Sequence, residues 1–236
     1  MLHPDLQGSY GAMSCVAWLL KRGWFRHVTD WLGRAALQTK KVDGLDCDER
    51  YIPSSDGNSE IRIRIYRPPG QSEKLPALLY IHGGGFIVED KESRQLRLLP
   101  YLARDWVVVN INYRLAHEAK APGAVVDCLK ALEWVYDNAE KYKIDTNRVV
   151  VSGDSAGGHL ALMTGLLKEG DSLCGDKHIV GQKNKAAAII NWYGITDFTL
   201  HAAFKRQLTK KPHDWFDPND DYGEVTTSLS PVKYVR

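Results

Sequence analysis

The stretch VVVSGDSAGGHLAL, residues 149–162, places a β-branched run, a glycine-flanked serine and a helical pattern in direct succession. Gly153 to Gly157 match the pattern G-x-S-x-G, in which a serine stands on a sharp turn between a strand and a helix. The glycines are needed because side chains two residues before and after the serine would collide there. By itself the pentapeptide fits a nucleophile turn and a glycine-rich turn with an incidental serine equally well.

A second glycine cluster, His82-Gly83-Gly84-Gly85, follows the apolar run ALLYI. Three successive glycines let the backbone approach a ligand with its N–H groups exposed, and an oxyanion hole is built from such donors. The alternative is a flexible loop. Its position after a buried strand, with G-x-S-x-G later in the chain, favours the oxyanion hole. Ser155 is then a candidate nucleophile at a helix N-terminus, where developing negative charge is favoured.

Continuous apolar runs, rather than alternating ones, are typical of strands buried on both faces of a parallel sheet. Four such runs are PALLYIHGGG, WVVVNINYR, RVVVSGDS and KAAAIINWYG. Helical patterns occur at about residues 92–104, 122–142 and 155–169. This alternation predicts an α/β fold built from βαβ units, with helices on both faces of the sheet and ligands bound at the carboxyl ends of the strands.

The segments before this core have a different pattern of apolar and polar residues. In EIRIRIYR, residues 60–67, isoleucine and arginine alternate, which predicts a strand with one buried and one solvated face. The preceding turn residues SSDGN predict a hairpin of about 50–54 with 60–66. Residues 10–40 carry apolar and aromatic residues at helical spacing, so one or two amphipathic helices are expected there.

Composition and charge exclude several classes of function. A net charge of +2 over 236 residues is too small to predict binding to nucleic acid or to an anionic membrane. The four cysteines lack the spacing of a zinc site or a redox pair, so we expect free thiols. Free thiols are typical of a reducing compartment, which predicts the cytoplasm. The apolar run AMSCVAWLL is too short to span a membrane. Neither glycine cluster fits G-x-G-x-x-G, so no dinucleotide is predicted. No other cofactor and no metal is predicted either.

Four stretches together resemble the hormone-sensitive-lipase-like branch of the α/β-hydrolases, the HGGG esterases. In chain order they are YIHGGGF (80–86), VVVNINYRLAHEAKAPGAVVDC (107–128), YKIDTNRVVVSGDSAGGHLA (142–161) and NWYGITDFT (191–199). The resemblance runs from about residue 48 to residue 236. It implies an α/β-hydrolase fold with a mostly parallel sheet and an N-terminal helical cap. It also implies hydrolysis of a small-molecule carboxylic ester through an acyl-enzyme.

The resemblance further implies roles for individual residues. Ser155 would be the nucleophile, and the N–H groups of Gly83, Gly84 and Ala156 would form the oxyanion hole. Residues 1–45 would form part of the cap over the substrate pocket. Four aromatic residues of this segment either line that pocket or only pack the cap onto the core: Trp18, Trp24, Phe25 and Trp31.

The acid and the histidine of a catalytic triad are not found where the resemblance places them. In α/β-hydrolases they follow the serine as Asp or Glu and then His. Asp197 with His201 or His213 keeps this order, yet the family's aspartate in this stretch is not the triad acid. SLSPVKYVR resembles the segment that leads into the family's seventh strand. We therefore expect a hydrolase core, residues 46–236, that lacks its last strands.

Three other histidines are weaker candidates for the base. His117 precedes the nucleophile in a structural loop, His159 lies one turn into the predicted helix, and His178 lies in a polar stretch expected to be a loop. Without a base, a serine has no activated oxygen. Only residual catalysis would then remain, about 10³–10⁴-fold over water in well-studied proteases.

Two hypotheses of function follow from the sequence. The first is a serine esterase that acts through Ser155, and the second is a catalytically incomplete fragment or a non-catalytic binding protein. The missing strands also predict that AAAIINWY is an exposed sheet edge through which the chain self-associates. Substrate identity, acyl length, ester or amide preference and oligomeric state are left open.

Overall fold

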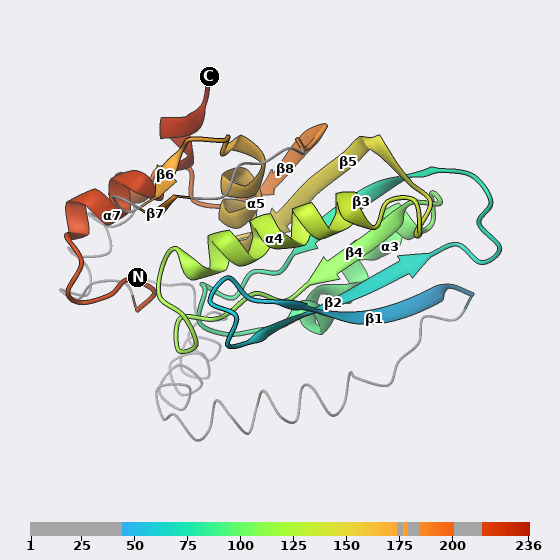
Figure 1. Cartoon of the computed structure of the whole chain (residues 1–236), viewed down its shortest axis with the longest axis horizontal. Helices are drawn as coiled ribbons and strands as arrows, with labels where there is room; N and C mark the ends of the chain where they lie inside the picture. The colour runs from blue at the N-terminus through green and yellow to red at the C-terminus, as the bar shows by residue number, and fades with distance from the viewer. Residues whose placement is uncertain (1–43, 174–176, 179–184, 201–213) are drawn as a thin grey trace, which may run out of the picture. The chain divides into compact units, whose positions relative to one another are not determined.

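The computed structural model covers most of the predicted hydrolase core (Figure 1). The residues that it describes are 44–173, 177–178, 185–200 and 214–236. Nearly all of the predicted cap segment, with its four candidate aromatic residues, lies outside the described residues. The cap and its pocket therefore stay predictions.

Within the described residues, six strands form one mixed sheet in the order β1-β2-β4-β3-β5-β8. The strands are β1 (Asp46–Pro53), β2 (Glu60–Arg67), β3 (Leu75–Ile81), β4 (Val107–Ile111), β5 (Ile144–Asp154) and β8 (Ala188–Trp192). Strands β3, β4, β5 and β8 are parallel, and the β1–β2 hairpin joins β4 in the antiparallel sense. The continuous apolar runs are therefore the parallel strands, as the sequence predicts.

The β1–β2 hairpin confirms the predicted alternation on one of its two faces. The isoleucines of β2 are buried, as expected. Arg64, predicted to lie on a solvated face, is also buried, with an exposed fraction of 6%. The prediction is wrong there because Glu92 covers this face and forms ion pairs with Arg62 at 2.6 Å and with Arg64 at 3.3 Å.

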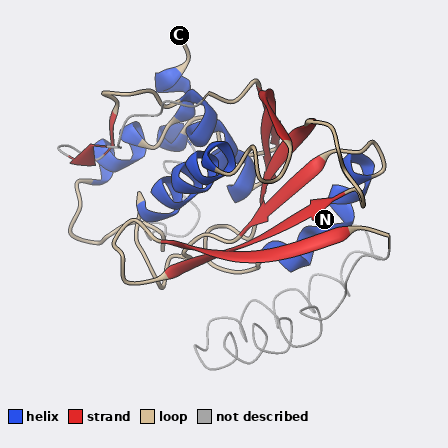
Figure 2. Cartoon of the chain, turned by 45° about the vertical axis from the view of Figure 1, so that its right-hand side comes forward, coloured by secondary structure: helices blue, strands red, loops and turns tan. Residues whose placement is uncertain are grey.

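Helices cover both faces of the sheet, as the crossover rule predicts (Figure 2). Helices α4 (Gly123–Asp137) and α5 (Ala156–Leu166) pack on one face. The 3₁₀ segment η1 (Lys91–Leu98) and the short helix α3 (Leu99–Leu102) pack on the other. The three helical patterns read from the sequence thus correspond to observed helices, with ends a few residues away.

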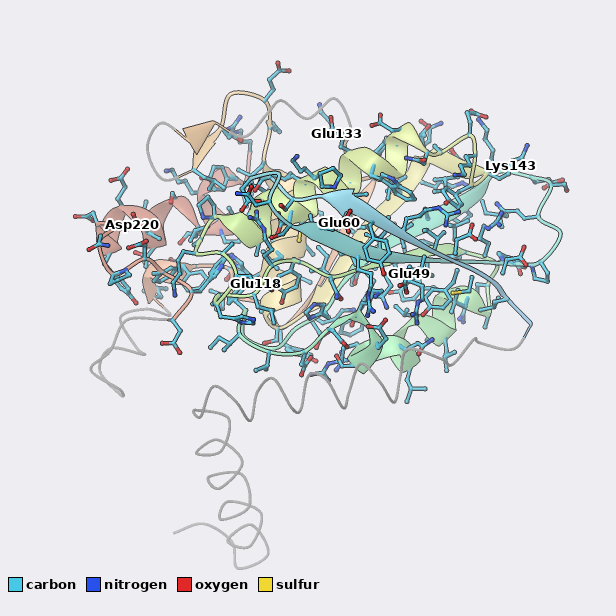
Figure 3. All side chains as sticks on the ribbon, turned by 60° about the horizontal axis from the view of Figure 1, so that its bottom comes forward. Glu49, Glu60, Glu118, Glu133, Lys143 and Asp220 are labelled. Carbon is cyan, nitrogen blue, oxygen red and sulfur yellow. The ribbon has the colours of Figure 1, made fainter. Side chains whose placement is uncertain are left out.

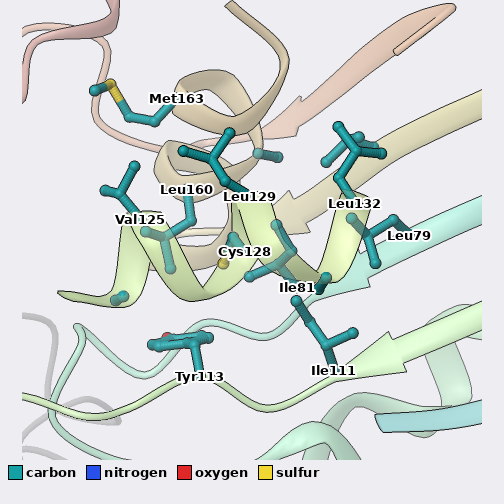
Figure 4. Packing of buried hydrophobic residues seen from close by; sticks show 14 of the residues in the cluster. Leu79, Ile81, Ile111, Tyr113, Val125, Cys128, Leu129, Leu132, Leu160 and Met163 are labelled. Atoms are coloured by element: carbon teal, nitrogen blue, oxygen red, sulfur yellow. The ribbon is translucent and has the colours of Figure 1, made fainter. Parts of the chain in front are cut away.

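Alternate residues of β3 divide between two hydrophobic cores. Leu79 and Ile81 belong to the larger core, where Cys128 of α4 and Leu160 of α5 lie above the sheet (Figure 4). Tyr80 points to the opposite face and packs in the smaller core beneath η1 and α3. Because successive side chains of a strand point to opposite faces, the end of β3 contributes to both layers.

Charged side chains are spread over the outside of the described part of the chain. Glu60, Glu118 and Glu133 are exposed, and nitrogen-tipped and oxygen-tipped side chains intermingle around them (Figure 3). This mixture agrees with the small net charge of +2. Among the described residues, no helix is both long and apolar enough to cross a membrane.

The last described residues pack against the chain that leaves β8. Helix α7 (Tyr222–Ser228) is followed by the short η2 (Pro231–Tyr234). The backbone N–H of Val232 donates to the carbonyl of Thr196 at 3.1 Å, which ties η2 to the segment after β8. The segment SLSPVKYVR therefore forms a helix end and a 3₁₀ turn.

A small separate hairpin pairs β6 (Ser172–Leu173) with β7 (Lys177–His178). His178, which the sequence placed in a loop, belongs to this short strand. The prediction is wrong because residue 178 pairs with residue 172, a contact that the polar composition of the stretch does not reveal.

Strand β8 is the last strand on its side of the sheet within the described residues, which confirms the predicted edge. It pairs with β5 alone, so one row of its backbone groups has no strand partner there. The end of the edge is open to solvent, with Trp192 49% exposed and Tyr193 65% exposed.

Candidate active site

Ser155 stands at the junction between β5, which ends at Asp154, and α5, which begins at Ala156. Its backbone has φ 54° and ψ −117°. Residues with a side chain adopt such a conformation rarely, at a cost of about 1–3 kcal/mol. The result is an exposed Ser155 between two buried neighbours, which is the geometry that G-x-S-x-G predicts.

Gly153 and Gly157 leave no room for a side chain on either side of the serine. A Cβ on Gly153 would lie 2.4 Å from the carbonyl oxygen of Gly157 and 2.5 Å from that of Ile81. A Cβ on Gly157 would lie 2.1 Å from the carbonyl oxygen of Ile81 and 2.5 Å from that of His82. The turn therefore packs backbone against backbone on the end of β3.

This contact brings the glycine cluster of residues 82–85 beside the serine turn. A Cβ on Gly83 would lie 2.8 Å from the carbonyl oxygen of Asp154. Gly84 has φ 87°, and a Cβ there would lie 1.9 Å from the carbonyl oxygen of Val88. The two motifs, about 70 residues apart in sequence, thus meet at the carboxyl ends of β3 and β5, where ligands are expected in such sheets.

Among the described residues, the predicted oxyanion-hole donors have no backbone acceptor. In the part of the chain that the structure describes, the N–H groups of Gly83 and Gly84 donate to no backbone carbonyl. Ala156 is the first residue of α5, and the first N–H groups of a helix have no partner inside it. The structure brings these three residues together with Ser155, and their chemical role stays a prediction.

Tyr113, for which the sequence predicted no role, holds the glycine loop through hydrogen bonds. Its hydroxyl donates to the carbonyl oxygens of Gly83 at 2.7 Å and of His82 at 3.1 Å. Its ring stacks on the buried imidazole of His82, with 4.4 Å between centroids and 16° between planes. The signal in the sequence was the position of Tyr113 just after β4, the strand adjacent to β3.

The buried His82 makes the stability of the fold depend on pH. Burial lowers the pKa of His82 from 6.5 to about 4, so the folded state holds a neutral ring while the unfolded chain is protonated below about 6.5. The unfolded state therefore binds more protons in this window. Stability is lost as the pH falls from about 6.5 toward about 4, with a slope of up to about 1.4 kcal/mol per pH unit.

Urea unfolding across this pH window measures the effect. The His82→Gln variant is expected to show the shallower slope of free energy of unfolding against pH, because it lacks the proton uptake. His117→Gln removes an exposed histidine and serves as the control. Equal slopes for wild type and His82→Gln would contradict the assignment.

Within the described residues, Ser155 Oγ makes no hydrogen bond to a base. His159 is buried on α5, where its Nδ1 lies 2.9 Å from the carbonyl oxygen of Ile195. Asp197 accepts hydrogen bonds from the backbone N–H groups of Thr199 at 2.9 Å and Leu200 at 3.3 Å. It therefore caps the turn after β8.

The remaining candidate histidines after β8, His201 and His213, lie outside the described residues. The role of either histidine as the base that activates Ser155 therefore stays a prediction. His117 is exposed on the loop after β4, as expected for a surface residue.

Asp154 is a second residue that sequence reasoning missed, although it is the charged residue directly before the serine. Its side chain is only 1% exposed, and Tyr80 Oη donates to its Oδ1 at 2.8 Å. Burial and this hydrogen bond raise the pKa of Tyr80 well above its usual value, so the hydroxyl remains a donor. The guanidinium groups of Arg94 and Arg97 approach Oδ2 at 3.7 Å and 3.9 Å.

Comparisons with known proteins find similarity to esterases. The sequence model of the BD-FAE family matches residues 63–236. Ethyl acetate hydrolase of Pseudomonas putida is 39% identical over 132 residues, which cover 54% of this chain and 41% of that protein. Carboxylesterase NlhH of Mycobacterium tuberculosis is 35% identical over 127 residues, which cover 53% and 40%. The chain spans about half the length of the curated relatives it matches, from 40% to 58%.

Solved esterase structures share the arrangement of strands and helices. A bacterial heroin esterase is 34% identical, with a TM-score of 0.54, and the match covers 69% of this chain and 51% of that one. An arylesterase is 25% identical, with a TM-score of 0.62, and the match covers 100% and 70%. The α/β-hydrolase fold expected from the sequence is confirmed. The chain belongs to the BD-FAE family, and with it to the hormone-sensitive-lipase-like esterases of the α/β-hydrolase fold.

Proposed function

We propose that the protein is a serine-dependent hydrolase of carboxylic esters that forms an acyl-enzyme on Ser155. The observation that carries the proposal is the backbone contact between Gly157 and the end of β3. Through it, an exposed serine and the N–H groups of Gly83, Gly84 and Ala156 lie at the same end of the sheet. These donors would stabilise the negative oxygen that develops when Ser155 attacks an ester carbonyl.

The chemistry requires a base in addition to these groups. Ser155 Oγ bonds to the carbonyl carbon and passes its proton to the base, which returns it to the alcohol that leaves. Water then cleaves the acyl-enzyme by the same steps. His201 and His213 are the candidates that follow β8 in the chain, and histidine is the usual base in this arrangement.

Covalent labelling and turnover together test the proposal on the full chain. A fluorophosphonate probe reports an activated serine, and p-nitrophenyl acetate reports complete turnover. Both signals in a sample with the circular dichroism of a folded α/β protein would support the esterase. Neither signal in such a sample would overturn it in favour of the non-catalytic binding protein.

The proposed substrates are small esters, in line with the name of the ethyl acetate hydrolase that the chain resembles. Trp18, Trp24, Phe25 and Trp31 remain the proposed pocket residues in the cap segment, residues 1–45. Hydrolysis rates for p-nitrophenyl acetate, butyrate and octanoate, beside p-nitroacetanilide, would establish acyl length and ester preference. The proposed compartment is the cytoplasm, which the free thiol of the buried Cys128 supports.

We also propose that the open edge of β8 mediates self-association. Ala188 is an exposed residue of this edge strand, and a charge on an edge strand disfavours pairing with another strand. The Ala188→Lys variant is expected to sediment with a larger monomer fraction than wild type. Ala103→Lys adds the same charge at an exposed position outside the sheet and should leave sedimentation unchanged. Equal monomer fractions for wild type and Ala188→Lys would contradict the proposal.

A further inference from the structure

A buried carboxylate lies directly beneath the proposed nucleophile. Asp154 precedes Ser155 in the chain, and a Cβ on Gly83 would lie 3.1 Å from Asp154 Oδ2. The carboxylate therefore borders both the nucleophile turn and the glycine loop. An uncompensated negative charge at this place would oppose the negative oxygen that the glycine loop is proposed to stabilise.

Most groups around Asp154 cannot supply the missing positive charge. Tyr80 donates to Oδ1 as a neutral hydroxyl, and Tyr193 Oη lies 3.4 Å from Oδ2. His82 is buried and neutral, since burial lowers its pKa to about 4. The cations beside Asp154 in the described residues are the guanidinium groups of Arg94 and Arg97 on η1.

These two arginines differ in their partners. Arg94 donates to both carboxylate oxygens of Glu89, at 3.0 Å and 2.7 Å, so its charge is balanced there. Arg97 forms an ion pair with no described carboxylate except Asp154. Its closest polar contact is the hydroxyl of Tyr193 at 2.7 Å, and its guanidinium lies 5.7 Å from the centre of the Tyr193 ring.

The backbone holds Tyr193 beside the nucleophile turn. Tyr193 directly follows β8 and has φ 48°, a left-handed conformation that is unusual for a residue with a large side chain. The carbonyl of the preceding Trp192 accepts the N–H of Ser155 at 2.8 Å. The end of β8 is therefore bonded to the serine turn at the point where Tyr193 reaches Arg97.

We propose that Arg97 is the counter-ion of Asp154 and that Tyr193 holds it in place, so that the site at Ser155 favours negative charge. Both are positioning residues, because they act on the site through Asp154. The inference rests on the proposed function for its meaning in catalysis. The electrostatic claim itself can be tested without turnover.

A thiol introduced by Ser155→Cys reports the local electrostatics directly. A thiolate carries its negative charge where the serine oxygen stands, so its pKa measures how well the site tolerates that charge. The pKa is obtained from the rate of iodoacetamide alkylation against pH. Mass spectrometry of the peptide that contains residue 155 separates this thiol from the four natural cysteines.

In this background, Arg97→Gln is expected to raise the pKa of the thiol by about 0.5 to 1, because a nearby positive charge is lost. Arg97→Lys keeps the charge and should leave that pKa close to the parent value. Tyr193→Phe should raise it by less, and should add little when Arg97→Gln is already present. The side chain of Arg97 is 38% exposed, so the effect of Arg97→Gln should shrink at high salt.

Arg148→Gln is the matched control. Arg148 also pairs with an aspartate, Asp145 at 2.6 Å, but it lies near the start of β5, about 20 Å from Asp154 at the strand's rise of about 3.3 Å per residue. An unchanged thiol pKa in Arg97→Gln, or an equal change in Arg148→Gln, would overturn the inference. If the thiol responds as expected in a chain without ester turnover, the proposed function fails while the counter-ion assignment stands.

Discussion

The Ser155→Ala variant is expected to lose fluorophosphonate labelling completely. Its turnover of p-nitrophenyl acetate should fall by on the order of 10³-fold or more, to the residual catalysis that the oxyanion hole and substrate binding supply without the serine oxygen. The reason is that the acyl-enzyme needs the serine oxygen, which no other group at this end of the sheet replaces in the described residues. In-gel fluorescence and the release of p-nitrophenol measure the two effects.

The control for Ser155→Ala is Ser72→Ala, which removes an exposed serine before β3. Ser72→Ala should label and turn over like wild type. Ser155→Ala should also keep the wild-type melting temperature, since its backbone conformation and its buried neighbours are unchanged. Retained labelling in folded Ser155→Ala would locate the reactive serine elsewhere and contradict the proposed function.

The Gly157→Ala variant is expected to lose more than about 3 kcal/mol of folding free energy, above the usual range for overpacking. Its Cβ would lie 2.1 Å and 2.5 Å from the carbonyl oxygens of Ile81 and His82, which are backbone atoms that no rotamer change can move. Any relaxation must separate α5 from the end of β3. Labelling of Ser155 should therefore slow in whatever fraction remains folded. The midpoint of urea unfolding measures the loss.

Helix propensity makes the opposite prediction for Gly157→Ala, because alanine in a helix is favoured over glycine by roughly 0.5–1 kcal/mol. The control is Gly223→Ala in α7, where the new Cβ meets only the side-chain oxygen of Asp221 at 3.3 Å. Gly223→Ala should shift the midpoint slightly, and Gly157→Ala should lower it strongly. A Gly157→Ala variant as stable as wild type would show that the two motifs do not pack as described.

Local patterns predicted the elements of the fold because backbone periodicity depends on short-range chemistry. The continuous apolar runs became the parallel strands, and the alternating EIRIRIYR became β2 of the hairpin. The same reasoning was wrong for Arg64. Its burial depends on Glu92, which is distant in sequence and reaches β2 from η1.

The sequence by itself determined the strained serine turn, the glycine loop after β3 and the family to which both belong. Those features could be predicted because each has a local pattern in the sequence: a glycine-flanked serine after a β-branched run, and three successive glycines after an apolar run. The tertiary structure alone decided that the two motifs touch through Gly157 and that Tyr113 braces the glycine loop. It also decided that Asp154 is a buried charge faced by Arg97. Such contacts join residues of different strands and helices, and the free energy of a buried charge depends on which partners the fold brings to it.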